Sequence, residues 1–237
     1  MLNFIFLFKI ILVGIVSSAV LPVEKCELKD SSCLIPAFQK AMPIFMSGMP
    51  QVGVEVLDVL EMDEVNFDLA GLKFSLKNGR LQGLKNSIVD NVKWDLEKKK
   101  MEIFFHVDCS VKGHYTAAGR ILILPITGDG QMKLKLKNLA ITLVINYENE
   151  EKEGKVFLIP KSYSFKFDVK NGANFDLTNL FNGNKELSEP MLLFLNENWK
   201  QISQEFGGPM MDASAKKLFQ SLVAFFSKVP LSDIATF

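Results

Sequence analysis

Residues 101–112 read MEIFFHVDCSVK and contain the longest clean alternation in the chain. Apolar side chains occupy every second position from Met101 to Val111, and the positions between them are polar except for Phe104. Successive side chains of a β-strand point to opposite faces, so this period of two predicts a strand with one buried and one solvated face. Cys109 falls on the apolar face, where we expect a buried thiol rather than a nucleophile.

Shorter alternating runs lie on both sides of this stretch, separated by turn signals. The signals are Asn78–Gly79, the charged run 97–100, the acidic run 148–154 and Asn171–Gly172. Strands joined by short turns indicate an antiparallel meander, and so many strands in one sheet require strong twist and curling. The expected strands cover residues 65–69, 72–76, 92–96, 101–111, 132–137, 141–147, 156–159 and 163–169.

Residues 119–130, GRILILPITGDG, break the alternation with the apolar run 121–126. We interpret this run as a strand covered on both faces and Gly128–Asp129–Gly130 as the turn that ends it. Pro125 then requires a strand edge, a bulge or a strand end. Either the even-numbered or the odd-numbered residues of the run would face the interior, and the pattern does not choose between them.

Residues 188–229 change to a helical period. Ser188 followed by Pro190 is a helix-start signal, and Pro209 predicts either a kink in one long helix or a division into two end-to-end helices. The apolar stripe is wide in its second half, so this helix must be enclosed. The expected fold is therefore α+β, a strongly curved antiparallel sheet wrapped around a long C-terminal helix. The stripe consists of Leu192, Leu195, Trp199, Ile202 and Phe206, followed by Ala215, Leu218, Leu222, Phe225 and Val229.

Residues 1–19 have the pattern of a secretory signal peptide, with small residues before a cut after Ala19. A membrane anchor is the alternative, although Lys9 leaves only residues 10–16 as an uninterrupted apolar stretch. We expect residues 20–237 to form a single domain. In an oxidising compartment Cys26 and Cys33 should form a disulfide loop. A short helix over residues 34–43, capped by Ser31 or Ser32, and a turn-rich loop over residues 48–53 follow.

Charge and motifs argue against several function classes. The chain has 27 basic and 27 acidic residues, so no basic excess points to nucleic acid or to an anionic membrane surface. His106 and His114 have no Cys or Glu at ligand spacing, which argues against a metal site. The chain lacks the nucleophile elbow and the phosphate-binding loop, and its carboxylates cluster at turns. We expect no catalytic residues, no cofactor and no enzyme activity.

Six separated motifs resemble the takeout / juvenile hormone-binding protein family of insects, in order along the whole mature chain. The resemblance implies a tubular lipid-binding fold and a secreted carrier that holds a terpenoid hormone, fatty-acid-like or quinone-like ligand in an internal tunnel. Moth haemolymph hormone carriers have a second disulfide that Cys109 alone cannot form, so the chain is more similar to the takeout branch. The motifs are the C-x6-C spacing, residues 48–50, 119–130, 179–185, 194–199 and 226–230.

The carrier hypothesis predicts a hydrophobic small-molecule partner, a monomer, and neither nucleic-acid binding nor stable membrane insertion. Its alternative is a secreted protein-interaction factor whose core is filled by side chains. Plain core packing is the other interpretation of every candidate lining residue. The methionines at 42, 46, 49, 210 and 211 are either deformable gates at a tunnel mouth or residues that fill gaps in the core, and we favour gap filling. The candidate tunnel lining comprises Phe105, Val107, Leu122, Leu124, Leu134, Leu136, Phe165, Phe167, Leu195, Trp199, Ile202 and Phe206.

Overall fold

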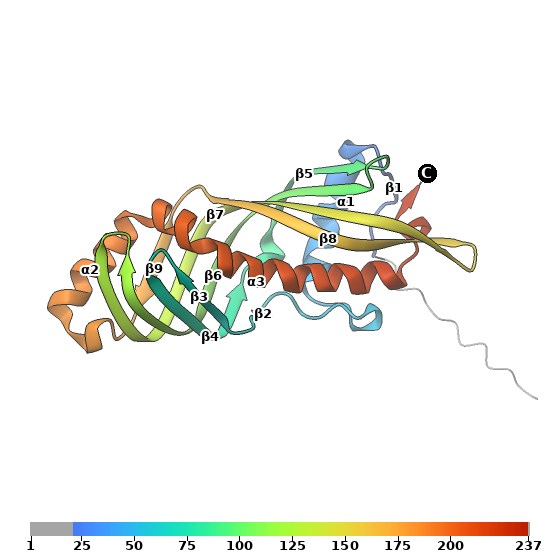
Figure 1. Cartoon of the computed structure of the whole chain (residues 1–237). Helices are drawn as coiled ribbons and strands as arrows, with labels where there is room; N and C mark the ends of the chain where they lie inside the picture. The colour runs from blue at the N-terminus through green and yellow to red at the C-terminus, as the bar shows by residue number, and fades with distance from the viewer. Residues whose placement is uncertain (1–20, 237) are drawn as a thin grey trace, which may run out of the picture.

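A computed structural model describes residues 21–236, so the predicted signal peptide lies outside the described residues. Figure 1 shows an elongated molecule in which a curved antiparallel sheet lies around the long helix α3 (Trp199–Lys228). Helix α1 (Ser31–Met46) packs against the sheet beside strand β5, and helix α2 (Lys185–Glu197) lies at the opposite end. The predicted α+β architecture is confirmed.

Two long strands form the spine of the sheet, since β6 has 22 residues and β7 has 29. The strand order is β2-β4-β6-β7-β8, while β3 pairs with β4, β5 with β6 and β9 with β7. Register shifts interrupt four of these pairings, and such bulges increase local twist and allow the sheet to bend. The strands are β2 (Leu60–Glu61), β3 (Val65–Leu69), β4 (Leu72–Gln82), β5 (Ile88–Asp95), β6 (Lys100–Ile121), β7 (Leu124–Lys152), β8 (Lys155–Val169) and β9 (Ala173–Leu177).

The alternation that predicted the central strand corresponds to real burial. Every second side chain from Met101 to Val111 is buried, and the residues between them are half-buried or exposed. The turn predicted at Asn78–Gly79 is wrong, because β4 continues through it with a bulge between Lys77 and Arg80. Asn78 adopts a φ of 52°, a left-handed conformation that Asn tolerates well, so the turn-forming residue bends a strand instead of ending it.

The prediction for the apolar run 121–126 is also wrong. β6 ends at Ile121 and β7 begins at Leu124, so Leu122 and Ile123 form a two-residue hairpin turn. Such turns usually contain Asn or Gly, and Leu122 with its φ of 53° carries no such signal. The run is therefore two strand ends and a turn, which explains why it does not alternate.

The predicted turn at 128–130 is a straight part of β7, and its glycines are required by close packing. A Cβ atom at Gly128 would lie 2.5 Å from the Tyr115 hydroxyl, and one at Gly130 would overlap the carbonyl oxygen of Thr178. The segment around Thr178 crosses β7 here, held by a hydrogen bond of 2.8 Å that the Tyr115 hydroxyl donates to the Thr178 carbonyl oxygen. These glycines make room for a neighbouring segment rather than reversing the chain.

The C-terminal helical region divides at Asn198, eleven residues before the expected kink. The N-cap of α2 is Asn184, whose side-chain oxygen accepts a hydrogen bond from the Leu187 N–H, and not Ser188. Pro209 lies inside α3, which continues through it. Asn196 fastens α2 to the edge strand β9, since its side chain both accepts from the Phe175 N–H and donates to the Phe175 carbonyl.

The N-terminal helix is longer than the predicted helix over residues 34–43, and the strand before it pairs with the C-terminal strand. α1 spans sixteen residues and is capped by Asp30, whose carboxylate accepts from the Ser32 and Cys33 N–H groups. The predicted Cys26–Cys33 disulfide is present. Strand β1 (Cys26–Glu27) pairs in parallel with β10 (Ala235–Thr236), so the disulfide loop also holds the C-terminus. Single-turn helices lie at Pro50–Val52, Leu84–Asn86, Phe181–Gly183 and Leu231–Asp233.

Candidate functional site

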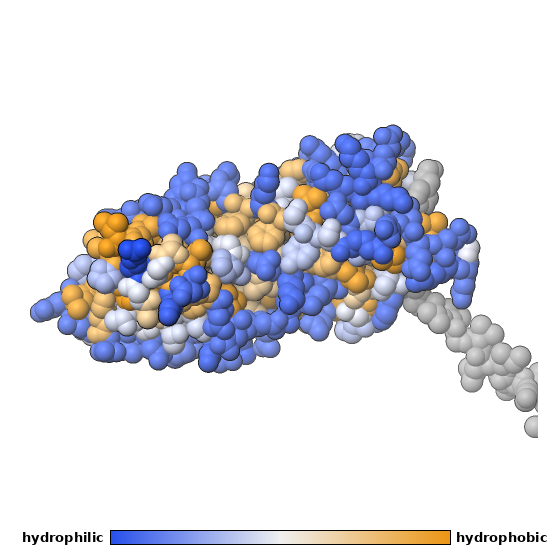
Figure 2. Space-filling model, in the orientation of Figure 1, coloured by the Kyte–Doolittle hydropathy of each residue, from blue (hydrophilic) through white to orange (hydrophobic). Residues whose placement is uncertain are grey.

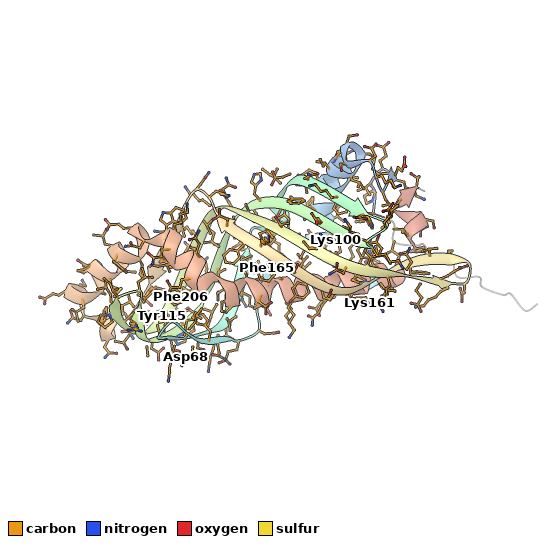
Figure 3. The ribbon with its side chains drawn as sticks, turned by 45° about the horizontal axis from the view of Figure 1, so that its top comes forward. Asp68, Lys100, Tyr115, Lys161, Phe165 and Phe206 are labelled. Carbon is orange, nitrogen blue, oxygen red and sulfur yellow. A yellow bond between two sulfur atoms is a disulfide. The ribbon has the colours of Figure 1, made fainter. Side chains whose placement is uncertain are left out.

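The main cavity lies between the concave face of the sheet and α3, with a volume of about 160 Å³. Strands β3, β4, β6, β7, β8 and β9 and helices α1, α2 and α3 contribute to its lining. Figure 3 labels three lining residues from three elements: Tyr115 of β6, Phe165 of β8 and Phe206 of α3. Among residues 21–236, the lining includes no charged side chain, and its polar members other than Cys109 are Tyr115, Ser203 and Ser214.

Two of these three hydroxyl groups already donate to the protein. Tyr115 donates to Thr178, and the Ser214 hydroxyl donates to the Met210 carbonyl at 3.1 Å. Burial raises the pKa of Tyr115 to about 12, with the Asp129 carboxylate adding to the shift, so the phenol is neutral at physiological pH. Within residues 21–236 the Ser203 hydroxyl has no hydrogen-bond partner. No fully buried side-chain oxygen in this part of the chain lacks a partner, so the Ser203 hydroxyl is at least partly accessible. Ser203 therefore offers a free O–H group to an occupant of the cavity.

A second cavity of about 120 Å³ lies under α1, at the disulfide end of the molecule. The two cavities share four lining residues, so the same side chains form part of the wall of both. Met46 at the end of α1 is one of these residues, and its flexible side chain packs adaptably. A shift of such side chains would join the cavities. The shared residues are Met46, Phe105, Leu143 and Leu218.

Most of the predicted lining residues lie around the main cavity, although their contact with a ligand stays a prediction. Five of these predicted residues belong to the sheet and three to the helical region. The expected apolar face of the strands therefore lies opposite the expected apolar stripe of the helices. The predicted residues found there are Phe105, Leu134, Leu136, Phe165, Phe167, Leu195, Ile202 and Phe206.

Four predicted residues lie elsewhere. Val107 is buried beside the β6 bulge without reaching the cavity, and Leu122 and Leu124 lie at the hairpin tip. Trp199 begins α3 directly after the break at Asn198, so a helical stripe extrapolated from Leu195 does not hold at this position.

Several lining residues were not predicted as such. Ile121 and Ile126 both line the cavity, although one has an odd and the other an even number in the run 121–126. They can face the same side because the two-residue turn between them reverses the chain, so odd residues of β6 and even residues of β7 share a face. Alternation on β6 could have identified Tyr115, but nothing local distinguishes Ser203 from the polar residues around it. Among the methionines interpreted as gap fillers, those at 46, 210 and 211 line the main cavity, those at 42 and 46 line the second, and Met49 is buried outside both.

Cys109 lines the main cavity as a buried thiol. Burial raises its pKa to about 12, and the carboxylates of Asp108 and Asp58 add to the shift. The thiolate is the reactive form, so only about one molecule in ten thousand is reactive at pH 8. We expect Ellman's reagent to leave the native protein unmodified at pH 8 and to label one thiol in urea. Rapid labelling without denaturant would contradict this burial.

Both histidines are engaged in ion-pair geometry on the surface. The His106 ring nitrogen lies 2.9 Å from Asp90, and that of His114 lies 2.6 Å from Asp129. Residues 21–236 contain no group of three His, Cys, Asp or Glu side chains placed to hold a metal ion. Over the same residues, no helix combines the length and hydropathy required to cross a bilayer.

A curved antiparallel sheet that encloses apolar cavities against a long helix defines the class of fold, one built to surround hydrophobic molecules. Comparison with known proteins identifies the family within this class. The profile of the haemolymph juvenile hormone binding protein (JHBP) family matches residues 6–236. The chain belongs to this family, which is a family of hydrophobic-ligand-binding proteins rather than enzymes.

Individual relatives agree with this assignment. The crystal structure of Epiphyas postvittana Takeout 1 has 61% sequence identity and a TM-score of 0.89, over 91% of this chain and all of that one. The circadian clock-controlled protein daywake of Drosophila melanogaster is 27% identical over 225 residues, 90% of this chain and 86% of daywake. The juvenile hormone-binding protein of Manduca sexta is 29% identical over 91 residues, which cover 37% of this chain and 40% of that protein. The resemblance to the takeout / juvenile hormone-binding family is thereby confirmed.

Proposed function

We propose that the protein is a secreted carrier that encloses one elongated, neutral hydrophobic molecule between the sheet and α3. The observation that supports this most is the main cavity, which is surrounded by apolar side chains from both layers and to which the described part of the chain contributes no charged lining residue. The Cys26–Cys33 disulfide is consistent with an oxidising compartment, and hence with secretion.

The lining chemistry favours a neutral ligand over an ionised fatty acid. A buried carboxylate needs a cation or several hydrogen-bond donors, because otherwise its desolvation is not compensated. The main cavity offers one free hydroxyl donor, that of Ser203. A neutral ester, ketone, ether or quinone with a long apolar tail requires no more than this. Each CH₂ group transferred from water to such a cavity contributes about 0.8 kcal/mol of binding free energy.

The alternative of a protein-interaction factor predicts a core filled by side chains. Two cavities of about 160 and 120 Å³ that are separated by shared lining residues favour the carrier instead. The hormone in the name of the Manduca sexta relative is one candidate ligand, and isoprenoid quinones and neutral lipids are others.

Two measurements test the carrier function. Protein purified from its native source is extracted with solvent and the extract is analysed by mass spectrometry. Recombinant protein is titrated with N-phenyl-1-naphthylamine, and methyl palmitate, palmitic acid, an isoprenoid quinone and juvenile hormone compete with the probe. We expect a co-purified neutral lipid and stronger competition by methyl palmitate than by the ionised acid. Absence of both bound lipid and probe binding would overturn the proposal.

Ser203→Ala should reduce affinity selectively for ligands that carry a hydrogen-bond acceptor. A net hydrogen bond is worth about 1 kcal/mol, so we expect about fivefold weaker competition by methyl palmitate and unchanged competition by octadecane. Ser214→Ala is the matched control on the same helix, because its hydroxyl already donates to Met210. Equal losses in both variants, or equal losses for ester and alkane, would show that Ser203 does not bind the polar group.

A further inference from the structure

The hairpin tip between β6 and β7 carries an apolar surface that the fold does not use. Ile123 is 85% exposed, the highest value among the large hydrophobic residues of the described chain. Pro125 is exposed too, and Leu122 and Leu124 are half-buried beside them. We call these four residues the apolar tip. They form a run without a polar side chain at the end of the sheet near α2, where apolar side chains gather on the surface in Figure 2.

Turn chemistry does not explain these residues. Leu122 adopts the left-handed conformation at a φ of 53°, where Asn or Gly would be less strained. The tip therefore keeps two large aliphatic side chains at positions where short polar residues would form the same turn more easily.

A free cation flanks the apolar tip. Arg120 directly precedes Ile121 and is exposed, and no carboxylate within residues 21–236 forms an ion pair with it. The turn that joins β3 to β4 lies against its side chain, since a Cβ atom at Gly71 would be 2.7 Å from the Arg120 Nε. Leu69, before that turn, is 39% exposed and adds apolar surface nearby.

The main cavity extends to the base of this tip. Ile121 and Ile126 line the cavity and lie immediately before and after the four tip residues. The wall of the cavity and the outer surface of the tip are thus formed by residues that are adjacent in the chain. An apolar molecule that passed between the cavity and another apolar phase beside the tip would meet apolar side chains on both sides of this point, which limits its exposure to water.

From these observations we infer that the apolar tip docks reversibly on an anionic lipid surface and is where cargo is exchanged with the membrane. The aliphatic side chains enter the lipid–water interface, and Arg120 binds headgroup phosphates. A lipid surface fits better than a folded partner, because a single hairpin tip is too small for a stable protein interface of about 1,200 Å² or more. This inference rests on the proposed carrier function, since it concerns how the same cavity is loaded and emptied.

Vesicle flotation tests the docking. The vesicles contain phosphatidylcholine with or without about one third phosphatidylserine. We expect the wild-type protein to float with the anionic vesicles, Ile123→Ser to bind about tenfold more weakly, and Arg120→Gln to lose about fivefold on anionic vesicles only. Ile88→Ser is the matched control, because Ile88 is 52% exposed on β5, beside α1 and away from the tip. Leu122→Asn suits a positive φ, so loss of flotation in this variant cannot be attributed to a strained turn.

Cargo transfer separates this inference from the carrier function. Protein loaded with N-phenyl-1-naphthylamine is mixed with acceptor vesicles, and the transfer rate is followed by fluorescence. We expect the rate to rise with vesicle concentration for wild type and Ile88→Ser, and to be lower for Ile123→Ser at equal probe affinity. A wild-type rate independent of vesicle concentration, or flotation of Ile123→Ser equal to that of wild type, would overturn docking and leave the carrier intact. Absence of probe binding would overturn the carrier function itself.

Discussion

Ala117→Phe is expected to weaken binding of N-phenyl-1-naphthylamine and of any cargo about a hundredfold while leaving the protein folded. Ala117 lies on β6 with its side chain at the main cavity, between Phe74 on β4 and Gly128 on β7. A phenyl ring there occupies space that cargo would use. Excluding about four CH₂ groups of ligand costs about 3 kcal/mol, which corresponds to about a hundredfold in affinity.

Ala118→Phe is the matched control, since Ala118 is the next residue of the same strand and is exposed on the opposite face. Its probe affinity should equal that of the wild type. Titration fluorimetry gives both affinities, and circular dichroism verifies the fold. Full probe binding by Ala117→Phe would mean that cargo is not held in the cavity between the sheet and α3.

Gly130→Ala should lower the free energy of unfolding by about 2–3 kcal/mol, because its Cβ atom would overlap the backbone of Thr178. The clash falls on a carbonyl group and not on the end of a flexible side chain, so relief requires the crossing segment to move away from β7. The Gln131 N–H, which donates to the Thr178 side chain at 2.8 Å, would be disturbed together with it. Chemical denaturation measures the loss.

Gly208→Ala is a control that should raise the free energy of unfolding instead of lowering it. Gly208 lies inside α3, and a Cβ atom there would meet no atom of another segment within 4 Å. Alanine should therefore stabilise the helix by about 0.5–1 kcal/mol. If Gly130→Ala were as stable as the wild type, the crossing of Thr178 over β7 would not be as close as described.

Local patterns were sufficient for the class of fold and for much of the cavity. Alternation depends only on which face of a strand is buried, so Phe105, Leu134 and Leu136 were expected on the inner face, and all three lie around the main cavity. Helical spacing likewise placed Ile202 and Phe206 on the side of α3 that faces the sheet. The paired cysteines, Cys26 and Cys33, lie close in sequence and required no knowledge of the rest of the chain.

The predictions were wrong where the conformation of a residue depends on contacts with segments that are distant in sequence. Leu122 forms a turn without any turn-forming residue, because β6 and β7 are held in register by many cross-strand pairs on either side of it. The division of the helical region at Asn198 accompanies the attachment of α2 to β9 through Asn196, a contact that crosses 21 residues of sequence. Trp199 directly follows this division and does not line the cavity.

The stretch 119–130 shows most clearly which features the sequence determines and which the tertiary structure decides. By itself the sequence determined that these residues are extended and largely apolar, because hydrophobicity and chain conformation are local properties. Only the tertiary structure decided that the chain reverses at Leu122–Ile123 and that Gly128 and Gly130 lie within a strand. A glycine is equally suited to a turn and to close packing, and what distinguishes the two is whether another segment, here the one carrying Thr178, lies against it.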